Sequence, residues 1–212
     1  MRLDTFLYPS IFTKLPKRTA FNVILIDPPW QYRDRINDHS RGAINHYPTL
    51  SLDQIKAFPI NDYSHAGTYL FLWTTKDFRI NAEKIMFTWG FEFKTEFIWV
   101  KTKQNKDGKP VLDSDEDLVP VGDVRIGMGH YNRLCHEVML LGVLPGANTP
   151  LKNATKEPSV FFASISEHSA KPAESYALIE RNVDPPYLEI FARKNRPNWV
   201  SWGNEIETPI LP

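Results

Sequence analysis

An acidic turn stiffened by two prolines, Asp27-Pro28-Pro29-Trp30, directly follows the apolar run 23–26. The amino group on a ring such as adenine is a poor nucleophile, because its lone pair is delocalised into the ring. It gains reactivity when acceptors hold both of its N–H groups. Asp27 supplies a charged acceptor and the Pro28 carbonyl a second, while the prolines remove backbone donors. Trp30 offers a face for stacking a base, so the string suits an exocyclic amine that receives a methyl group.

A second string of nearly the same composition, Asp184-Pro185-Pro186-Tyr187, stands before an apolar run instead of after one. Ligands of open α/β sheets bind beyond the carboxyl ends of the strands. We therefore expect Asp27 at the binding edge of a sheet. Asp184 is expected in a structural turn at the opposite edge.

The composition is typical of one globular domain: 212 residues, 42% hydrophobic and 24% charged, with zero net charge. No run approaches the roughly 18 apolar residues of a membrane span, and the N-terminus lacks a signal-peptide pattern. These features predict a cytoplasmic location. The single cysteine, Cys135, excludes an internal disulfide and a cysteine-based metal cluster, and we expect it in the core.

Basic residues cluster in two places, after the first turn and again at 101–109. Either cluster is compatible with a solvated surface. Beside an amine-orienting turn, Arg33 and Arg35 are candidate contacts to a polyanionic substrate such as nucleic acid. Zero net charge argues mildly against a stand-alone, tight nucleic-acid binder, so a homodimer or a partner subunit is also expected.

Apolar runs alternate with helical periodicity along the chain. We expect strands at 21–26, 68–73, 93–100, 136–143 and 187–192, and a further apolar run at 199–202. Helices are expected after an N-cap at Ser51, over 82–89 and over 172–183. This alternation predicts an α/β fold with a mostly parallel sheet. The polar stretch 102–132 is predicted as a surface insertion in a single domain, 1–212.

A methyl donor needs a site of its own. S-adenosylmethionine carries ribose hydroxyls, which suit acidic or amide groups, and a carboxylate, which suits a lysine or a helix N-terminus. Such groups occur at the ends of the expected strands and helices. They include Lys171, Glu189, Arg193, Asn195, Asn204 and Glu205. Taken singly, a lysine such as Lys171 is more often a surface residue than a ligand contact, and an asparagine such as Asn204 more often caps a loop.

These segments together resemble the DPPW family of N6-adenine methyltransferases, which includes the catalytic subunit of the eukaryotic messenger-RNA adenosine methyltransferase and bacterial and phage relatives. The resemblance extends over residues 21–205. It rests, in chain order, on 27–30, 46–49 with Ser51, 71–73, 89–91 with 98–101, 167–172, 189–193, and 197–199 with 203–204.

The resemblance implies a Rossmann-like S-adenosylmethionine-dependent methyltransferase fold. Its sheet is mixed, mostly parallel and seven-stranded, with a permuted order in which the catalytic motif precedes the cofactor strand. Asp27 and Pro28, in the catalytic turn with Pro29, would orient the adenine amine. Trp30 and Tyr47 would shape the base pocket. The implied cofactor contacts are Asp27, Lys171, Glu189, Arg193, Asn195, Asn204 and Glu205, the last two on the ribose, and no metal is needed.

The leading hypothesis is therefore methylation of the N6 amine of adenine in nucleic acid, with DNA favoured slightly over RNA. One alternative is methylation of the cytosine exocyclic amine or of a protein amide, since similar turns occur in such enzymes. Another is a catalytically silent nucleic-acid-binding subunit, because members of this family pair as active and inactive partners. The complete Asp-Pro-Pro-Trp string argues against a catalytically silent subunit.

Overall fold

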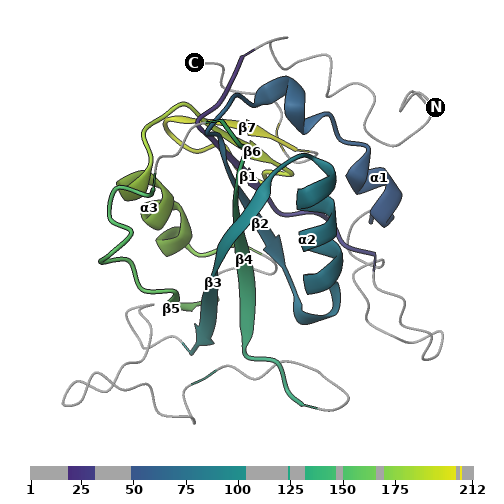
Figure 1. The fold of residues 1–212 in the computed structure, drawn as a ribbon. Coiled ribbons are helices and arrows are strands. Elements are labelled where there is room, and N and C mark those ends of the chain that lie inside the picture. The colour runs from purple at the N-terminus through teal and green to yellow at the C-terminus, as the bar shows by residue number, and fades with distance from the viewer. Residues whose placement is uncertain are drawn as a thin grey trace. The chain divides into compact units, whose positions relative to one another are not determined.

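The structure is a computed structural model that describes residues 19–31, 49–103, 124, 132–146, 150–165, 170–203 and 206. It is an α/β fold with a mixed, mostly parallel seven-stranded sheet of order β5-β3-β4-β2-β1-β6-β7 (Figure 1). The strands are β1 (Val23–Ile26), β2 (Tyr69–Thr74), β3 (Glu92–Thr102), β4 (His136–Val143), β5 (Val160–Ser164), β6 (Tyr187–Ile190) and β7 (Trp199–Trp202). The α-helices are α1 (Leu52–Lys56), α2 (Arg79–Thr88) and α3 (Ala173–Asn182), and the 3-10 helices are η3 (Ile60–Tyr63) and η4 (Lys76–Phe78).

The expected elements are present, but several end at other residues. The strand predicted for 187–192 ends at Ile190, because Phe191 has a φ of +67° and so leaves the extended conformation. The strand predicted for 93–100 continues to Thr102, into the stretch predicted as an insertion. Of that stretch the structure describes only residues 102, 103, 124 and 132. Strand β5 is not predicted by the sequence.

The helix ends follow the expected capping chemistry. Ser51 is the N-cap of α1: its Oγ accepts from the Gln54 N–H at 3.2 Å, and the Gln54 side chain accepts from the Ser51 N–H at 2.8 Å. Pro172 is the N-cap of α3 and stands just before its first turn. The helix predicted over 82–89 corresponds to α2, in which Ala82, Ile85 and Met86 are buried.

Contacts divide the chain into two compact units. The first unit comprises Met1–Lys94, Leu140–Thr149 and Pro185–Pro212, and the second comprises Thr95–Met139 and Pro150–Asp184. The single-domain organisation remains a prediction.

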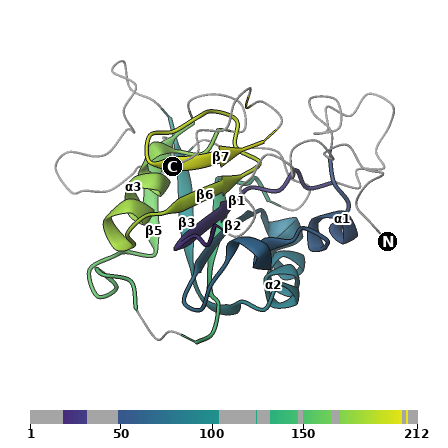
Figure 2. The ribbon, with the colours of Figure 1, turned by 90° about the horizontal axis from the view of Figure 1, so that it is seen from above.

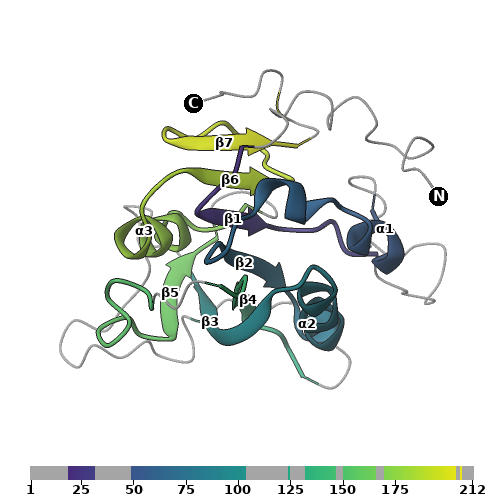
Figure 3. The same cartoon turned by 45° about the horizontal axis from the view of Figure 1, so that its top comes forward.

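Four strands of the first unit are parallel and in register. Val23 of β1 lies beside Tyr69 of β2 and Tyr187 of β6, and Tyr187 lies beside Trp199 of β7 (Figures 2 and 3). Strand β1 is fully buried, as its continuous apolar run predicts. Because the strands are parallel, their carboxyl ends share one edge, and the segments that follow them meet there.

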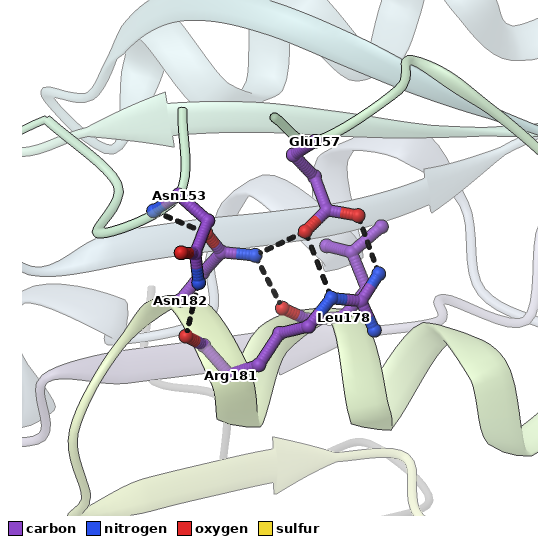
Figure 4. Close-up of polar contacts among 5 residues, drawn as sticks. All are labelled: Asn153, Glu157, Leu178, Arg181 and Asn182. Carbon is purple, nitrogen blue, oxygen red and sulfur yellow. Dashed lines mark hydrogen bonds and ion pairs between the residues drawn. The ribbon is translucent and has the colours of Figure 1, made fainter. Parts of the chain in front are cut away.

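In the second unit, β5 pairs in parallel with β3, and a polar network ties the segment before β5 to α3. The nearly buried Glu157 carboxylate accepts from the Arg181 guanidinium and from the Asn182 amide (Figure 4). Burial opposes ionisation of Glu157, but these hydrogen bonds outweigh it and lower the pKa of the carboxyl. The Asn153 amide donates to the Arg181 carbonyl at 2.9 Å, which satisfies an acceptor in the last turn of α3.

Candidate active site

In the turn after β1, both proline carbonyls accept backbone hydrogen bonds. The Trp30 N–H donates to the Pro28 carbonyl at 2.8 Å, and the Leu50 N–H donates to the Pro29 carbonyl at 2.9 Å. Trp30 and Leu50 also form an isolated parallel bridge. Asp27 is half-buried at the start of this turn. These bonds fix the proline carbonyls next to Asp27 at the carboxyl edge of the first unit.

The Trp30 ring anchors this turn to β2. The residue is 5% exposed, its ring stacks on Phe78 with centroids 5.1 Å apart, and its Nε1–H donates to the Trp73 carbonyl at 3.3 Å. We expected an open face on which a base could stack. In this structure Phe78 covers one face of the ring, so Trp30 sets the position of the turn, and its contact with a base stays a prediction.

The second proline string lies at the amino edge, as predicted. The Pro186 carbonyl accepts from the N–H groups of Asn22 and Val23, at the start of β1, and Tyr187 opens β6. Asp184 is 71% exposed and pairs with Lys152 at 2.5 Å. Asp184 is the last residue of the second unit, and its carboxylate therefore belongs to a surface turn.

The carboxyl ends of β6 and β7 approach each other closely. The Ala192 N–H donates to the Trp202 carbonyl at 2.9 Å, and a Cβ on Gly203 would lie 2.0 Å from the Ala192 carbonyl oxygen. Phe191, with its positive φ, packs on Phe58 with centroids 5.0 Å apart. Glycine at 203 is therefore required by space, and it keeps the segments after β6 and β7 together.

Candidate cofactor residues lie at this edge. Glu189 is half-buried on β6, in register with Leu25 and Ser201. Arg193 and Asn195 are exposed in the segment that follows β6. Together with Asp27, these side chains give the carboxyl edge of the first unit two acids, a guanidinium and an amide.

The second unit carries Lys171 next to an acid that the sequence did not reveal. The Glu137 carboxylate on β4 accepts from the ammonium of Lys101 at 2.5 Å and lies 3.2 Å from that of Lys171. The side chains of Lys171 and Glu137 are only 11% and 17% exposed. Burial opposes ionisation of Glu137, but Lys171 and Lys101 outweigh it and hold the pKa of the carboxyl below its usual range. Lys171 is thus a paired, largely buried cation rather than a surface lysine.

Comparison with known proteins decides the family. The MT-A70 family matches residues 21–205, which is most of the chain. The chain belongs to the MT-A70 family. This result confirms the family predicted from the motifs.

Relatives of the MT-A70 chain are named as methyltransferases. The human N(6)-adenine-specific methyltransferase METTL4 is 30% identical over 201 residues, which cover 89% of this chain and 38% of the human protein. The type II methyltransferase M.MunI of Mycoplasma sp is 28% identical over 218 residues, covering 93% of this chain and 82% of that enzyme. The human N(6)-adenosine-methyltransferase catalytic subunit METTL3 is 28% identical over 190 residues, covering 88% of this chain and 28% of METTL3.

Several candidate site residues, from the motifs and from the basic cluster after the first turn, lie outside the described residues. They are Arg33, Arg35, Tyr47, Asn204 and Glu205. Cys135 differs from its expectation: it is half-exposed, not a core residue, because it precedes β4 instead of lying within it.

Two further properties of the described residues concern metal binding and membranes. Within that part of the chain, no group of three or more His, Cys, Asp or Glu side chains could hold a metal ion. None of its helices is long and apolar enough to cross a membrane.

Proposed function

We propose that this chain transfers a methyl group from S-adenosylmethionine to the N6 amine of adenine in nucleic acid. The observation that carries the proposal is the Asp27 turn, a half-buried carboxylate and a fixed proline carbonyl at the carboxyl edge of a parallel sheet. Membership of the MT-A70 family supports the same reaction. One relative is named for adenine and another for adenosine. Both DNA and RNA should therefore be tested as substrates, and we favour DNA.

The turn suits the needs of an exocyclic amine. The Asp27 carboxylate would accept one N–H and would stabilise the cationic amine that forms as the methyl group arrives. The Pro28 carbonyl accepts the Trp30 N–H. A carbonyl oxygen has two lone pairs, so Pro28 can still accept the second amine N–H. The burial of Trp30 anchors the turn that carries both acceptors.

The residues present also fit the donor. When bound, S-adenosylmethionine would supply an electrophilic methyl group on its sulfonium. Asp27 and Glu189 are acceptors suited to hydroxyl or ammonium groups, and Arg193 and Asn195 are donors suited to a carboxylate. We propose Asn204 and Glu205 as ribose contacts, Lys171 as a further cofactor contact, Tyr47 in the base pocket, and Arg33 and Arg35 on substrate phosphates.

The test is labelled methyl transfer to single- and double-stranded DNA and RNA, with nucleoside mass spectrometry of the product. The two proline strings provide a matched pair of variants, Asp27→Ala and Asp184→Ala. We expect N6-methyladenine from the wild type, a loss of at least about 100-fold in Asp27→Ala, and near wild-type activity in Asp184→Ala, because that carboxylate is exposed.

Three outcomes would overturn the proposal. A product methylated on cytosine or on a protein amide would assign the chain to another substrate. Equal activity of Asp27→Ala and wild type would remove Asp27 from the reaction. No incorporation into any adenine-containing nucleic acid would leave the silent-subunit alternative.

A further inference from the structure

One carboxylate in the second unit is shared by two lysines. Oxygen Oε1 of Glu137, on β4, accepts from the Lys101 ammonium of the neighbouring strand β3 at 2.5 Å, and oxygen Oε2 lies 3.2 Å from the Lys171 ammonium. The side chains of Glu137, Lys101 and Lys171 are 17%, 21% and 11% exposed, so solvent screens their charges only weakly. Glu137 is therefore the anion that allows two cations to lie in one largely buried cluster.

Lys101 is held at several points besides Glu137. Its ammonium lies 5.0 Å from the centre of the Trp99 ring, and its backbone N–H donates to the Cys135 carbonyl at 2.8 Å. Trp99 is 2% exposed, and its Nε1–H donates to the Ala163 carbonyl at 2.8 Å. Lys101 thus has a fixed place at the base of the cluster, and it fixes one oxygen of Glu137 in turn. The other oxygen is directed to Lys171.

Lys171 lies directly before α3, and Pro172 is the N-cap of that helix. A helix N-terminus disfavours a nearby cation, and burial and a second ammonium both favour loss of a lysine's proton. The charged groups of other elements that face Lys171 include Glu137 of β4 and, across that carboxylate, Lys101 of β3. On its own segment, Glu174 in the first turn of α3 is exposed. Burial opposes ionisation of Glu137, but the two lysines hold the pKa of its carboxyl below the usual range, so it is ionised at neutral pH and above.

We propose that Glu137 is a positioning residue, which keeps Lys171 charged and directs its ammonium towards the carboxylate of a bound methyl donor. Lys101 supports this role by holding Glu137. The role rests on the proposed function, in which Lys171 is a cofactor contact. A hydrogen bond between two charged groups is stronger than a neutral one, so donor binding depends on the proton of Lys171. Without the carboxylate, Lys171 would face Lys101 directly and would release its proton at a lower pH than in the wild type.

Two ligands separate this role from a general loss of structure. S-adenosylhomocysteine carries the amino-acid tail with its carboxylate, and methylthioadenosine has the same adenine and ribose without that tail. Isothermal titration calorimetry of the full chain from about pH 6.5 to about pH 9 measures both dissociation constants. In Glu137→Gln, S-adenosylhomocysteine should bind at least about tenfold more weakly than in the wild type at the alkaline end, with a smaller difference at the acid end. The affinity for methylthioadenosine should stay close to its wild-type value throughout.

Further variants test the charge itself. Adding Lys101→Met to Glu137→Gln removes the cation that faces Lys171, so the affinity for S-adenosylhomocysteine should again follow the wild-type pH dependence. Lys171→Met should lose the preference for S-adenosylhomocysteine over methylthioadenosine at every pH. Glu92→Gln, which breaks an exposed pair with Lys94 on β3, is the matched control and should bind both ligands like the wild type. Circular dichroism checks that each variant folds, and Lys171→Met and the double variant decide if Glu137→Gln does not.

Glu137 does not have this role if Glu137→Gln follows the wild-type pH dependence, if the double variant binds as weakly as Glu137→Gln, or if Lys171→Met keeps its preference for S-adenosylhomocysteine. Each of these results is compatible with methyl transfer by the wild type. A wild type that binds neither ligand would instead remove the donor site, and the proposed function and the role of Glu137 would fail together.

Discussion

The pairing of Glu137 is the feature of the site that the sequence motifs did not reveal and the structure does. It lies between two lysines, and loss of its charge would leave two partly buried cations facing each other. We expect Glu137→Gln to lower the free energy of unfolding at pH 7 by about 3 kcal/mol. Urea unfolding followed by circular dichroism measures this loss. Glu92→Gln, which removes an exposed partner of Lys94, is the control and should cost far less.

The pH dependence of this effect has a definite sign. The pKa of Glu137 is lowered in the folded chain from the ordinary 4.5. Its carboxylate therefore stabilises the fold above the unfolded pKa, and that contribution is lost as the pH falls through the folded pKa. The stability difference between wild type and Glu137→Gln should shrink as the pH is lowered from 7 towards 3. A difference that stays constant over this range would contradict an ionised Glu137.

The positions of residues in the fold were predictable where local sequence decides them. The position of Asp27 after a strand, and of Asp184 before one, follows from neighbouring residues. The pairing of Glu137 with Lys101 depends on residues 36 positions apart, and the burial of Trp30 depends in part on Phe78. Sheet topology brings these groups together, so composition and spacing do not reveal them.

At the scale of elements, the tight junction after β6 and β7 makes a quantitative prediction. A side chain at Gly203 would overlap the Ala192 carbonyl oxygen, which is backbone and has little room to shift. We expect Gly203→Ala to cost at least about 3 kcal/mol or to prevent folding. Gly90→Ala is the control: its φ of +85° is strained, but a Cβ there meets Leu144 at an ordinary 3.6 Å, so it should cost about 1 kcal/mol. Equal losses in urea unfolding would show that the junction tolerates a methyl group.

Strand prediction was most direct where burial is continuous, and the partly exposed β5 was missed. The runs that became β1 and β2 are buried along their whole length and appear as unbroken apolar segments. Strand β5 has Val160 and Phe162 partly exposed, and its short run lies between Ser159 and Ser164. The end of β6 was predicted two residues too late, because nothing in the sequence indicates that Phe191, an aromatic residue, adopts a positive φ.

At the scale of the whole molecule, donor binding separates an enzyme from a silent subunit. A ligand that binds only the folded chain at about 100 times its dissociation constant adds about 2.7 kcal/mol of stability. For a chain of this size that is a rise of roughly 5–11 °C in Tm. We expect S-adenosylmethionine to produce such a rise in differential scanning fluorimetry. Arg193→Ala should reduce it, and Asp184→Ala, which removes an exposed carboxylate of the second unit, should not. A wild-type Tm that does not respond to saturating S-adenosylmethionine would mean that the chain has no working donor site, whatever its family.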